Sequence, residues 1–179
     1  MNNTEVPYFI GKNFDQVCYV VDDLEKAMDY WTRVNGVRVW DYVEGISDRL
    51  VNKEYWGQPA DFGYSCAYGA CGNVMVELAV HQQGPSLYGD WLAEGQRGPH
   101  HIGFLLDDPD QYEEACEVYA GRGLVKAMAG LADGVCGWSY WDTREQVGSY
   151  TELYWTADWA RERMAQFKAG EVDSLFPKS

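Results

Sequence analysis

Four polar side chains stand among apolar neighbours at positions where their types could bind a metal ion. They are Gln16, Glu77, His101 and Glu152. Each lies in a segment whose alternating pattern predicts a β-strand, on the strand face opposite the helix-packing residues. A buried carboxylate costs several kcal/mol unless it is paired or metal-bound. Two carboxylates, an imidazole and an amide can together coordinate a metal ion, so we predict a metal centre formed by these residues.

The four residues occupy matched positions of an internal repeat. Residues 16–23 read QVCYVVDD and residues 101–108 read HIGFLLDD, which places Gln16 on His101. Residues 76–78 (VEL) and 151–153 (TEL) form the second matched pair, which places Glu77 on Glu152. Each repeat therefore contributes one candidate ligand from its first strand and one from its last.

The segments between the matched strands predict the remaining elements. After each Asp pair an amphipathic stretch predicts a helix with an aspartate N-cap. Two further strands follow in each repeat, at 37–45 and 61–70 in the first and at 124–131 and 136–143 in the second. We expect an α+β fold of two tandem βαβββ modules. Their boundaries are 13–80 and 99–156, with a Gly-rich connector at 81–98 and a C-terminal helix and tail at 157–179.

Composition narrows the classes of partner. The 179 residues carry a net charge of −14, with 28 acidic against 14 basic side chains, and no basic cluster that would favour nucleic acid. No apolar run reaches the ~20 residues of a membrane span, and no secretory signal is visible. The five cysteines fit a reduced, cytoplasmic protein, and we interpret Cys66 and Cys71 as buried thiols. Aromatic residues make up 15% of the chain, which favours an apolar or aromatic ligand.

The repeat and its four candidate ligands resemble those of the vicinal oxygen chelate superfamily. This superfamily includes glyoxalase I, methylmalonyl-CoA epimerase, extradiol dioxygenases and bleomycin-resistance proteins. The resemblance covers about residues 13–156. Residues 16–36 are similar to the opening strand and helix of glyoxalase I, whereas residues 84–104 resemble epimerase-like members. The resemblance implies a U-shaped mixed sheet around one divalent metal ion (Zn, Ni, Co, Mn or Fe). It carries the ligand roles onto Gln16, Glu77, His101 and Glu152, and it implies a homodimer.

One position departs from the glutathione-dependent glyoxalases. Those enzymes resemble one another in an Arg four residues beyond the first ligand, where this chain has Val20. The missing Arg and the acidic chain argue against a dianionic glutathione conjugate as substrate. We expect a small apolar or aromatic carbonyl compound instead.

The resemblance implies that the metal acts as a Lewis acid on a substrate bound through adjacent oxygens. We predict a metal-dependent lyase or isomerase in which Glu152 is the base and Glu77 its partner on the opposite face. An extradiol-type ring-cleaving dioxygenase is an alternative, although it normally needs two His, and only His100 and His81 are spare. A non-catalytic protein that binds an aromatic ligand is the other alternative.

Overall fold

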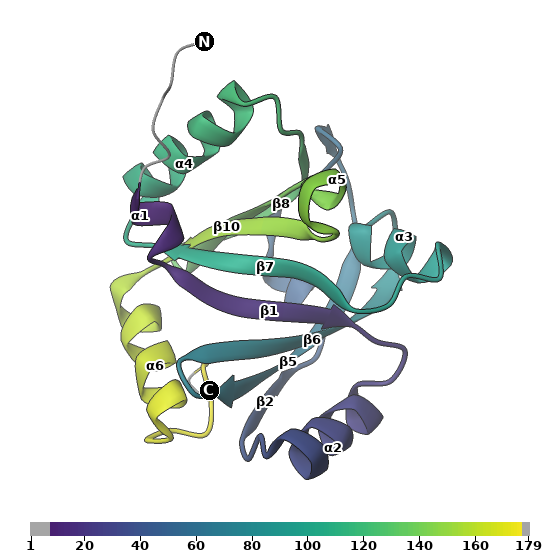
Figure 1. Ribbon diagram of the computed structural model, residues 1–179, viewed down its shortest axis with the longest axis vertical. Helices are drawn as coiled ribbons and strands as arrows, with labels where there is room; N and C mark the ends of the chain where they lie inside the picture. The colour runs from purple at the N-terminus through teal and green to yellow at the C-terminus, as the bar shows by residue number, and fades with distance from the viewer. Residues whose placement is uncertain (1–7, 177–179) are drawn as a thin grey trace.

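The structure is a computed structural model that describes residues 8–176, and its centre is a ten-stranded mixed sheet curled into a half-barrel (Figure 1). The strand order is β2-β5-β6-β1-β7-β10-β9-β8-β3-β4. The strands are β1 (Phe14–Val20), β2 (Trp40–Val43), β3 (Val51–Tyr55), β4 (Gln58–Pro59), β5 (Gly63–Cys71), β6 (Val74–Gln83), β7 (Pro99–Leu106), β8 (Lys126–Ala132), β9 (Cys136–Trp141) and β10 (Tyr150–Thr156). The predicted α+β fold with a curled mixed sheet is confirmed.

The four central strands form two symmetric pairs. In each repeat the first strand pairs in parallel with the last, β1 with β6 and β7 with β10. The two repeats meet where β1 runs antiparallel to β7. Because the expected ligands lie on the first and last strand of each repeat, this arrangement places all four on adjacent strands of one chain.

Helices cover the outer face and the two ends of the sheet (Figure 1). They are α1 (Tyr8–Gly11), α2 (Leu24–Asn35), the 3₁₀ helix η1 (Ile46–Arg49), α3 (Leu87–Ala93), α4 (Pro109–Gly121), α5 (Arg144–Val147) and α6 (Asp158–Ala169). The aspartates after the first strands cap α2 and α4 as expected, because Asp23 accepts from the Lys26 amide and Asp108 from the Gln111 amide. The connector region was not predicted to contain a helix, yet it holds α3.

Apolar residues alternate between the two faces of the sheet. Val17, Tyr19 and Leu78 pack with α2 on the outer face. Cys18, Val20 and many aromatic side chains form a separate cluster on the inner face. Residues from α3, α6 and the segment after α6 join that inner cluster, so they close the two ends of the half-barrel.

The hairpin β3–β4 departs from a simple two-module arrangement. It belongs to the first repeat in sequence, but β3 pairs antiparallel with β8 of the second repeat. Residues 44–50 therefore connect β2, at one edge of the sheet, with β3 on the other arm. The polar sequence of β3, VNKEY, lacks the alternation that predicts a strand. Because this connection is short, the two arms of the curled sheet must lie close enough together for residues 44–50 to reach from β2 to β3.

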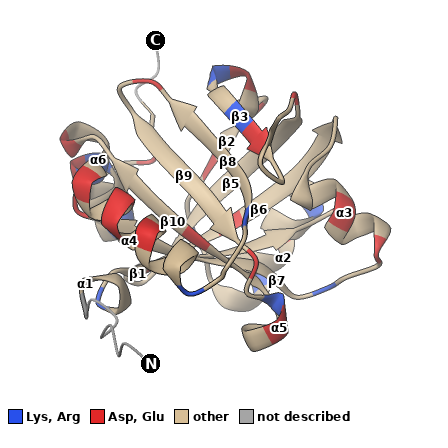
Figure 2. Cartoon of the chain, turned by 90° about the horizontal axis from the view of Figure 1, so that it is seen from above, with Lys and Arg blue, Asp and Glu red and all other residues tan. Residues whose placement is uncertain are grey.

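Helix α4 carries four acidic residues and no basic one, whereas α6 carries both signs of charge, as the colours in Figure 2 show. Within residues 8–176, no helix combines the length and apolar character needed to cross a membrane.

A mostly buried ion pair holds α6 against the sheet. The Lys168 ammonium on α6 pairs with the Asp15 carboxylate on β1, and the two side chains are 15% and 11% exposed. The Tyr154 hydroxyl on β10 donates to the other oxygen of Asp15 at 2.6 Å. This contact links the C-terminal helix to two of the four central strands.

We expect Lys168→Met to lower the free energy of unfolding by about 3 kcal/mol, because it leaves the Asp15 carboxylate buried without its cation. Urea unfolding measures the change. Lys126→Met is the matched control, since Lys126 pairs with Glu54 in an exposed bridge and its loss should cost less than about 1 kcal/mol. Equal effects of the two substitutions would contradict this account.

Candidate metal centre

The structure brings Gln16, Glu77, His101 and Glu152 into one buried cluster. Gln16 Nε2 donates to Glu77 Oε2 at 2.8 Å and to Glu152 Oε2 at 3.0 Å, and lies 3.3 Å from His101 Nε2. His101 Nε2 lies 3.3 Å from Glu77 Oε2 and 3.4 Å from Glu152 Oε2. All four residues are at most 5% exposed.

The strand register explains why the cluster forms. In the β1–β7 pair, Gln16 lies opposite Gly103, and His101 lies opposite Cys18. Glu77 pairs with Cys18 and Glu152 pairs with Gly103. Each glutamate thus lies opposite the residue two positions beyond the first ligand of its own repeat. The four side chains point to the same face because strand residues alternate with a period of two.

The two repeats differ in the side chains that donate hydrogen bonds to their glutamates. The Cys66 thiol on β5 donates to Glu77 Oε1 at 2.8 Å, and the Cys18 thiol also hydrogen-bonds Glu77. The Cys66 contact holds Oε1 of Glu77, and the other oxygen, Oε2, faces Gln16 and His101. Cys66 is a buried thiol, as expected, but its contact with Glu77 was not predicted. Cys71, expected to be buried, is exposed because it lies at the β5–β6 turn.

Glu152 stands in a different environment. Gly103 takes the place that Cys18 has in the first repeat, and a Cβ on Gly103 would lie only 2.9 Å from Glu152 Oε2. Trp138 on β9 takes the place of Cys66, because Tyr140 pairs with Glu152 as Tyr68 pairs with Glu77. Glycine therefore leaves room for the Glu152 carboxylate and supplies no side-chain donor.

The pKa values of the three ionisable groups reflect these surroundings. Burial alone would raise the pKa of Glu77, but hydrogen bonds from His101, Cys66 and Cys18 outweigh it and lower the pKa. Burial dominates at Glu152 and raises its pKa, although His101 opposes the shift. Burial disfavours the His101 imidazolium, yet the two glutamates outweigh that effect and raise its pKa to about 9. Glu152 is therefore the more basic carboxylate.

A cavity of about 280 Å³ opens over this cluster on the inner face of the half-barrel. Gln16, Glu77 and Glu152 form its floor. Its walls are mostly apolar and include six aromatic side chains, Tyr64, Tyr68, Trp138, Tyr140, Tyr154 and Phe176. Residues from η1, α6 and the segment after α6 close its outer side. The volume lies near the lower end for small-molecule sites, which suits a compact apolar ligand.

The donor set of the cluster suits a divalent cation. Two glutamate oxygens accept from the amide nitrogen of Gln16, and His101 Nε2 lies 3.3 Å from the same nitrogen. A half-turn of that amide would present its oxygen instead, and amide orientation follows from the hydrogen bonds around it. Two carboxylates, one imidazole and one amide oxygen match the ligand preferences of Zn, Ni, Co, Mn and Fe ions.

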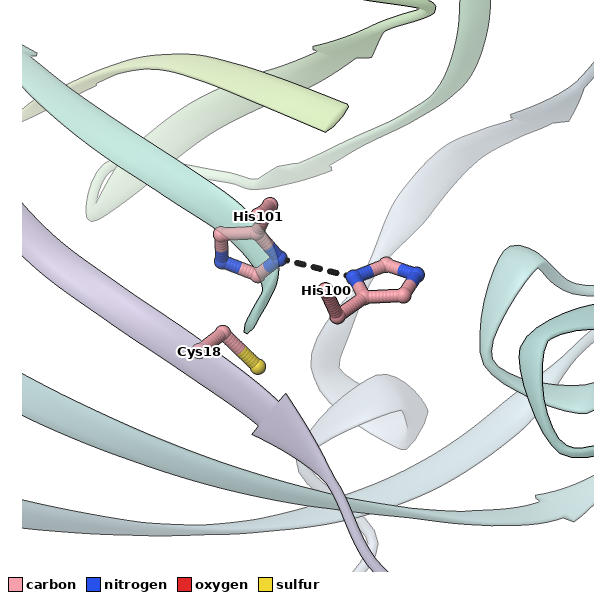
Figure 3. A group of neighbouring side chains, drawn as sticks. All are labelled: Cys18, His100 and His101. Atoms are coloured by element: carbon pink, nitrogen blue, oxygen red, sulfur yellow. Dashed lines mark hydrogen bonds between the residues drawn. The ribbon is translucent and has the colours of Figure 1, made fainter. Parts of the chain in front are cut away.

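The two spare histidines do not join the ligand face of the cluster. His81 Nδ1 lies 2.9 Å from the Ser86 hydroxyl at the start of α3. His100 is buried, but its Nδ1 contacts Nδ1 of His101 at 3.0 Å, on the ring edge turned away from the carboxylates (Figure 3). With Cys18, the two rings form a second group of potential ligand atoms. The two-histidine set of a ring-cleaving dioxygenase is not assembled at the carboxylates by residues 8–176.

Comparison with protein families gives a match over residues 15–141 to the glyoxalase/bleomycin resistance protein/dioxygenase superfamily. The chain belongs to this superfamily. The match includes Gln16, Glu77 and His101, while Glu152 lies beyond its end. Superfamily members typically bind a divalent metal and small-molecule substrates. No curated protein matches the chain significantly.

Solved structures share the superfamily fold at low sequence identity. A hypothetical protein from Bacillus halodurans C-125 aligns with a TM-score of 0.58 and 14% identity, over 81% of this chain and 94% of that one. Methylmalonyl-CoA epimerase from Mycobacterium tuberculosis aligns with a TM-score of 0.58 and 18% identity, over 88% and 93%. A Streptomyces coelicolor epimerase variant in complex with 2-nitronate-propionyl-CoA aligns with a TM-score of 0.52 and 15% identity, over 82% and 95%.

We expect a divalent ion such as Zn²⁺ to bind with release of about one proton at pH 7.5. Below about pH 9 His101 holds a proton that the ion must displace, so affinity should rise about tenfold per pH unit and level off above pH 9. Calorimetric titration in buffers of different ionisation enthalpy measures both quantities.

Two ligand variants complete this experiment. Glu77→Ala and His101→Ala should each lower the bound metal strongly, as elemental analysis of the purified proteins would show. Full metal content in both variants would mean that the ion binds elsewhere.

Proposed function

We propose that the chain is a metal-dependent lyase or isomerase that moves a proton on the carbon next to a carbonyl group. The observation that carries this proposal is that two carboxylates, Glu77 and Glu152, line the same apolar cavity but differ in their hydrogen-bond donors and in the direction of their pKa shifts. Hydrogen bonds from His101 and from the two thiols outweigh burial and lower the pKa of Glu77, whereas burial outweighs His101 and raises the pKa of Glu152, which has no thiol donor. One fixed ligand and one basic, less restrained carboxylate are what proton abstraction requires.

In this proposal the four cluster residues, Gln16, Glu77, His101 and Glu152, hold one divalent ion. The ion supplies Lewis-acid polarisation of the substrate carbonyl, which makes the neighbouring proton acidic. Glu152 takes that proton and returns it. Because two thiols restrain Glu77, we favour Glu152 as the group that performs both transfers. A two-base isomerisation requires Glu77 to return the proton from the opposite face.

The cavity walls support a small, mostly uncharged substrate. Trp138 and Tyr140 lie beside Glu152 and offer flat apolar surfaces to a ring or an alkyl chain. Arg49 is the one cationic residue among the described residues that line the cavity, and its guanidinium lies 5.6 Å from the Phe176 ring centre. Val20 lies in the inner core and offers no positive charge for a glutathione carboxylate. A compact carbonyl compound fits this lining best.

Two further expectations from the sequence stay predictions. A homodimer is common among members of the superfamily, and analytical ultracentrifugation tests it for this chain. The cytoplasmic location is likewise a prediction.

We expect Glu152→Gln to keep the fold and part of the bound metal while turnover falls about a hundredfold, because the amide can ligate but cannot take a proton. In D₂O, the native protein should exchange the proton next to the carbonyl of small aromatic carbonyl compounds, as proton NMR would show, and the variant should not. Glu117→Gln, on the exposed face of α4, is the control.

Exchange at the native rate in Glu152→Gln would assign the base to Glu77 or to a hydroxide. Oxygen consumption without any exchange would favour the dioxygenase alternative. Ligand binding with neither reaction would favour a non-catalytic binding protein.

We also expect aromatic carbonyl compounds to change the tryptophan fluorescence through Trp138, because that ring lines the cavity. Trp138→Phe should remove the change, whereas Trp159→Phe, on the exposed start of α6, should keep it. The adduct of methylglyoxal with glutathione should be turned over poorly. Rapid turnover of that adduct would contradict the proposed substrate class.

A further inference from the structure

His100 lies beside the candidate metal centre, is completely buried, and contacts His101. Its Nδ1 lies 3.0 Å from Nδ1 of His101. Figure 3 shows the two rings meeting edge to edge, with Cys18 beside them. The opposite edge of His101 carries Nε2, which faces Glu77 and Glu152. His100 therefore contacts His101 on the side away from the carboxylates.

Two imidazole nitrogens at this distance share one proton, so one ring donates and the other accepts. For His101 to turn an Nε2 lone pair toward a cation, its own proton must sit on Nδ1. His100 must then accept at Nδ1 and carry its proton on Nε2. The geometry thus couples the proton position on His100 to the ligand atom that His101 presents.

The surroundings of His100 favour this arrangement. Four aromatic rings enclose it, with centroids 5.0 Å away for Tyr88, 5.2 Å for Trp91, 5.1 Å for Tyr150 and 5.9 Å for Tyr140. His100 is completely buried within this enclosure, and its ring hydrogen-bonds the side chain of His101. Its Nε2 has no hydrogen-bond partner in residues 8–176, so the contact with His101 is made through Nδ1 alone.

We propose that His100 is a positioning residue, which accepts a hydrogen bond from Nδ1–H of His101 and thereby keeps the Nε2 lone pair directed at the centre between Glu77 and Glu152. Metal-binding histidines usually donate their second N–H to a carboxylate, a carbonyl or water. Here a second histidine takes that place. This inference rests on the proposed metal centre, but it does not depend on which reaction the centre performs.

A metal ion held between Cys18, His100 and His101 is the competing interpretation of the same group, because one potential ligand atom from each lies within 4.8 Å of the others. The Nδ1–Nδ1 distance of 3.0 Å favours the hydrogen bond. Two nitrogens at about 2.0–2.1 Å from a tetrahedral zinc ion would stand roughly 3.3 Å apart. None of the three residues lines the cavity over the carboxylates.

The experiment compares two substitutions of His100 in the full-length protein. His100→Asn keeps an acceptor near the position of Nδ1, whereas His100→Phe keeps an aromatic ring and removes the acceptor. We expect Zn²⁺ affinity, measured by competition with a chromophoric chelator, to fall about 10- to 100-fold in His100→Phe and much less in His100→Asn. His81→Phe is the matched control, because His81 contacts Ser86 and lies outside the cluster.

A second measurement does not depend on the stability of any variant. The chain contains three histidines, so a long-range ¹H–¹⁵N spectrum of the native protein with Zn²⁺ can be assigned by elimination. We expect His101 to be protonated on Nδ1 and bound through Nε2, and His100 to be protonated on Nε2. Native affinity in a folded His100→Phe protein, or binding of the ion through Nδ1 of His101, would overturn the proposal.

Cobalt distinguishes the competing interpretation. A thiolate-to-cobalt charge-transfer band that Cys18→Ala removes would place the ion at Cys18 and also overturn the positioning role. Failure of the proposed function would look different: Zn²⁺ binding and the effect of His100→Phe would remain, but no proton exchange would occur. If the native protein bound no ion at Glu77, the metal centre and this inference would fail together.

Discussion

The site depends on one constraint, the electrostatic repulsion between two carboxylates that are buried side by side. Glu77 and Glu152 share one amide donor, Gln16, and lie near one imidazole, His101, in the buried interior of the sheet. Like charges in such a place are tolerated only when a cation or shared protons offset them. The thiols, the raised pKa of His101 and the convergence on Gln16 all reduce the same repulsion. A divalent ion would reduce it most directly, because it brings two positive charges to the point where the acceptors meet.

The repeat made much of this site predictable. Gln16, Glu77, His101 and Glu152 could be aligned because each breaks an apolar strand at the matched place, and the structure brings them together. The Asp pairs that begin α2 and α4 were equally visible, because capping is a local property of the chain. Both signals depend on short-range pattern, which a single sequence displays.

Contacts that depend on register between distant strands could not be predicted. Nothing in the sequence around Cys66 indicates that its thiol reaches Glu77 across the β5–β6 pair. The same holds for His100, which looked like a spare ligand until the ring geometry was known. The β3–β4 hairpin carries too few apolar residues for a strand pattern, and its partner β8 is supplied by the other repeat. Long-range pairing decided these features, and no local signal reports it.

The crossing of β3 to the second repeat has a consequence for how the chain is made. Val51 pairs with Leu131, so the first repeat leaves the ribosome with a strand whose partner has not been synthesised. That hairpin must wait, unpaired, until β8 emerges, and its polar composition keeps it from aggregating meanwhile. The two repeats are therefore not independent folding units. Cutting the chain at the connector would leave β3 and β4 in one fragment without their partner, and it would expose the edge of β8 in the other fragment.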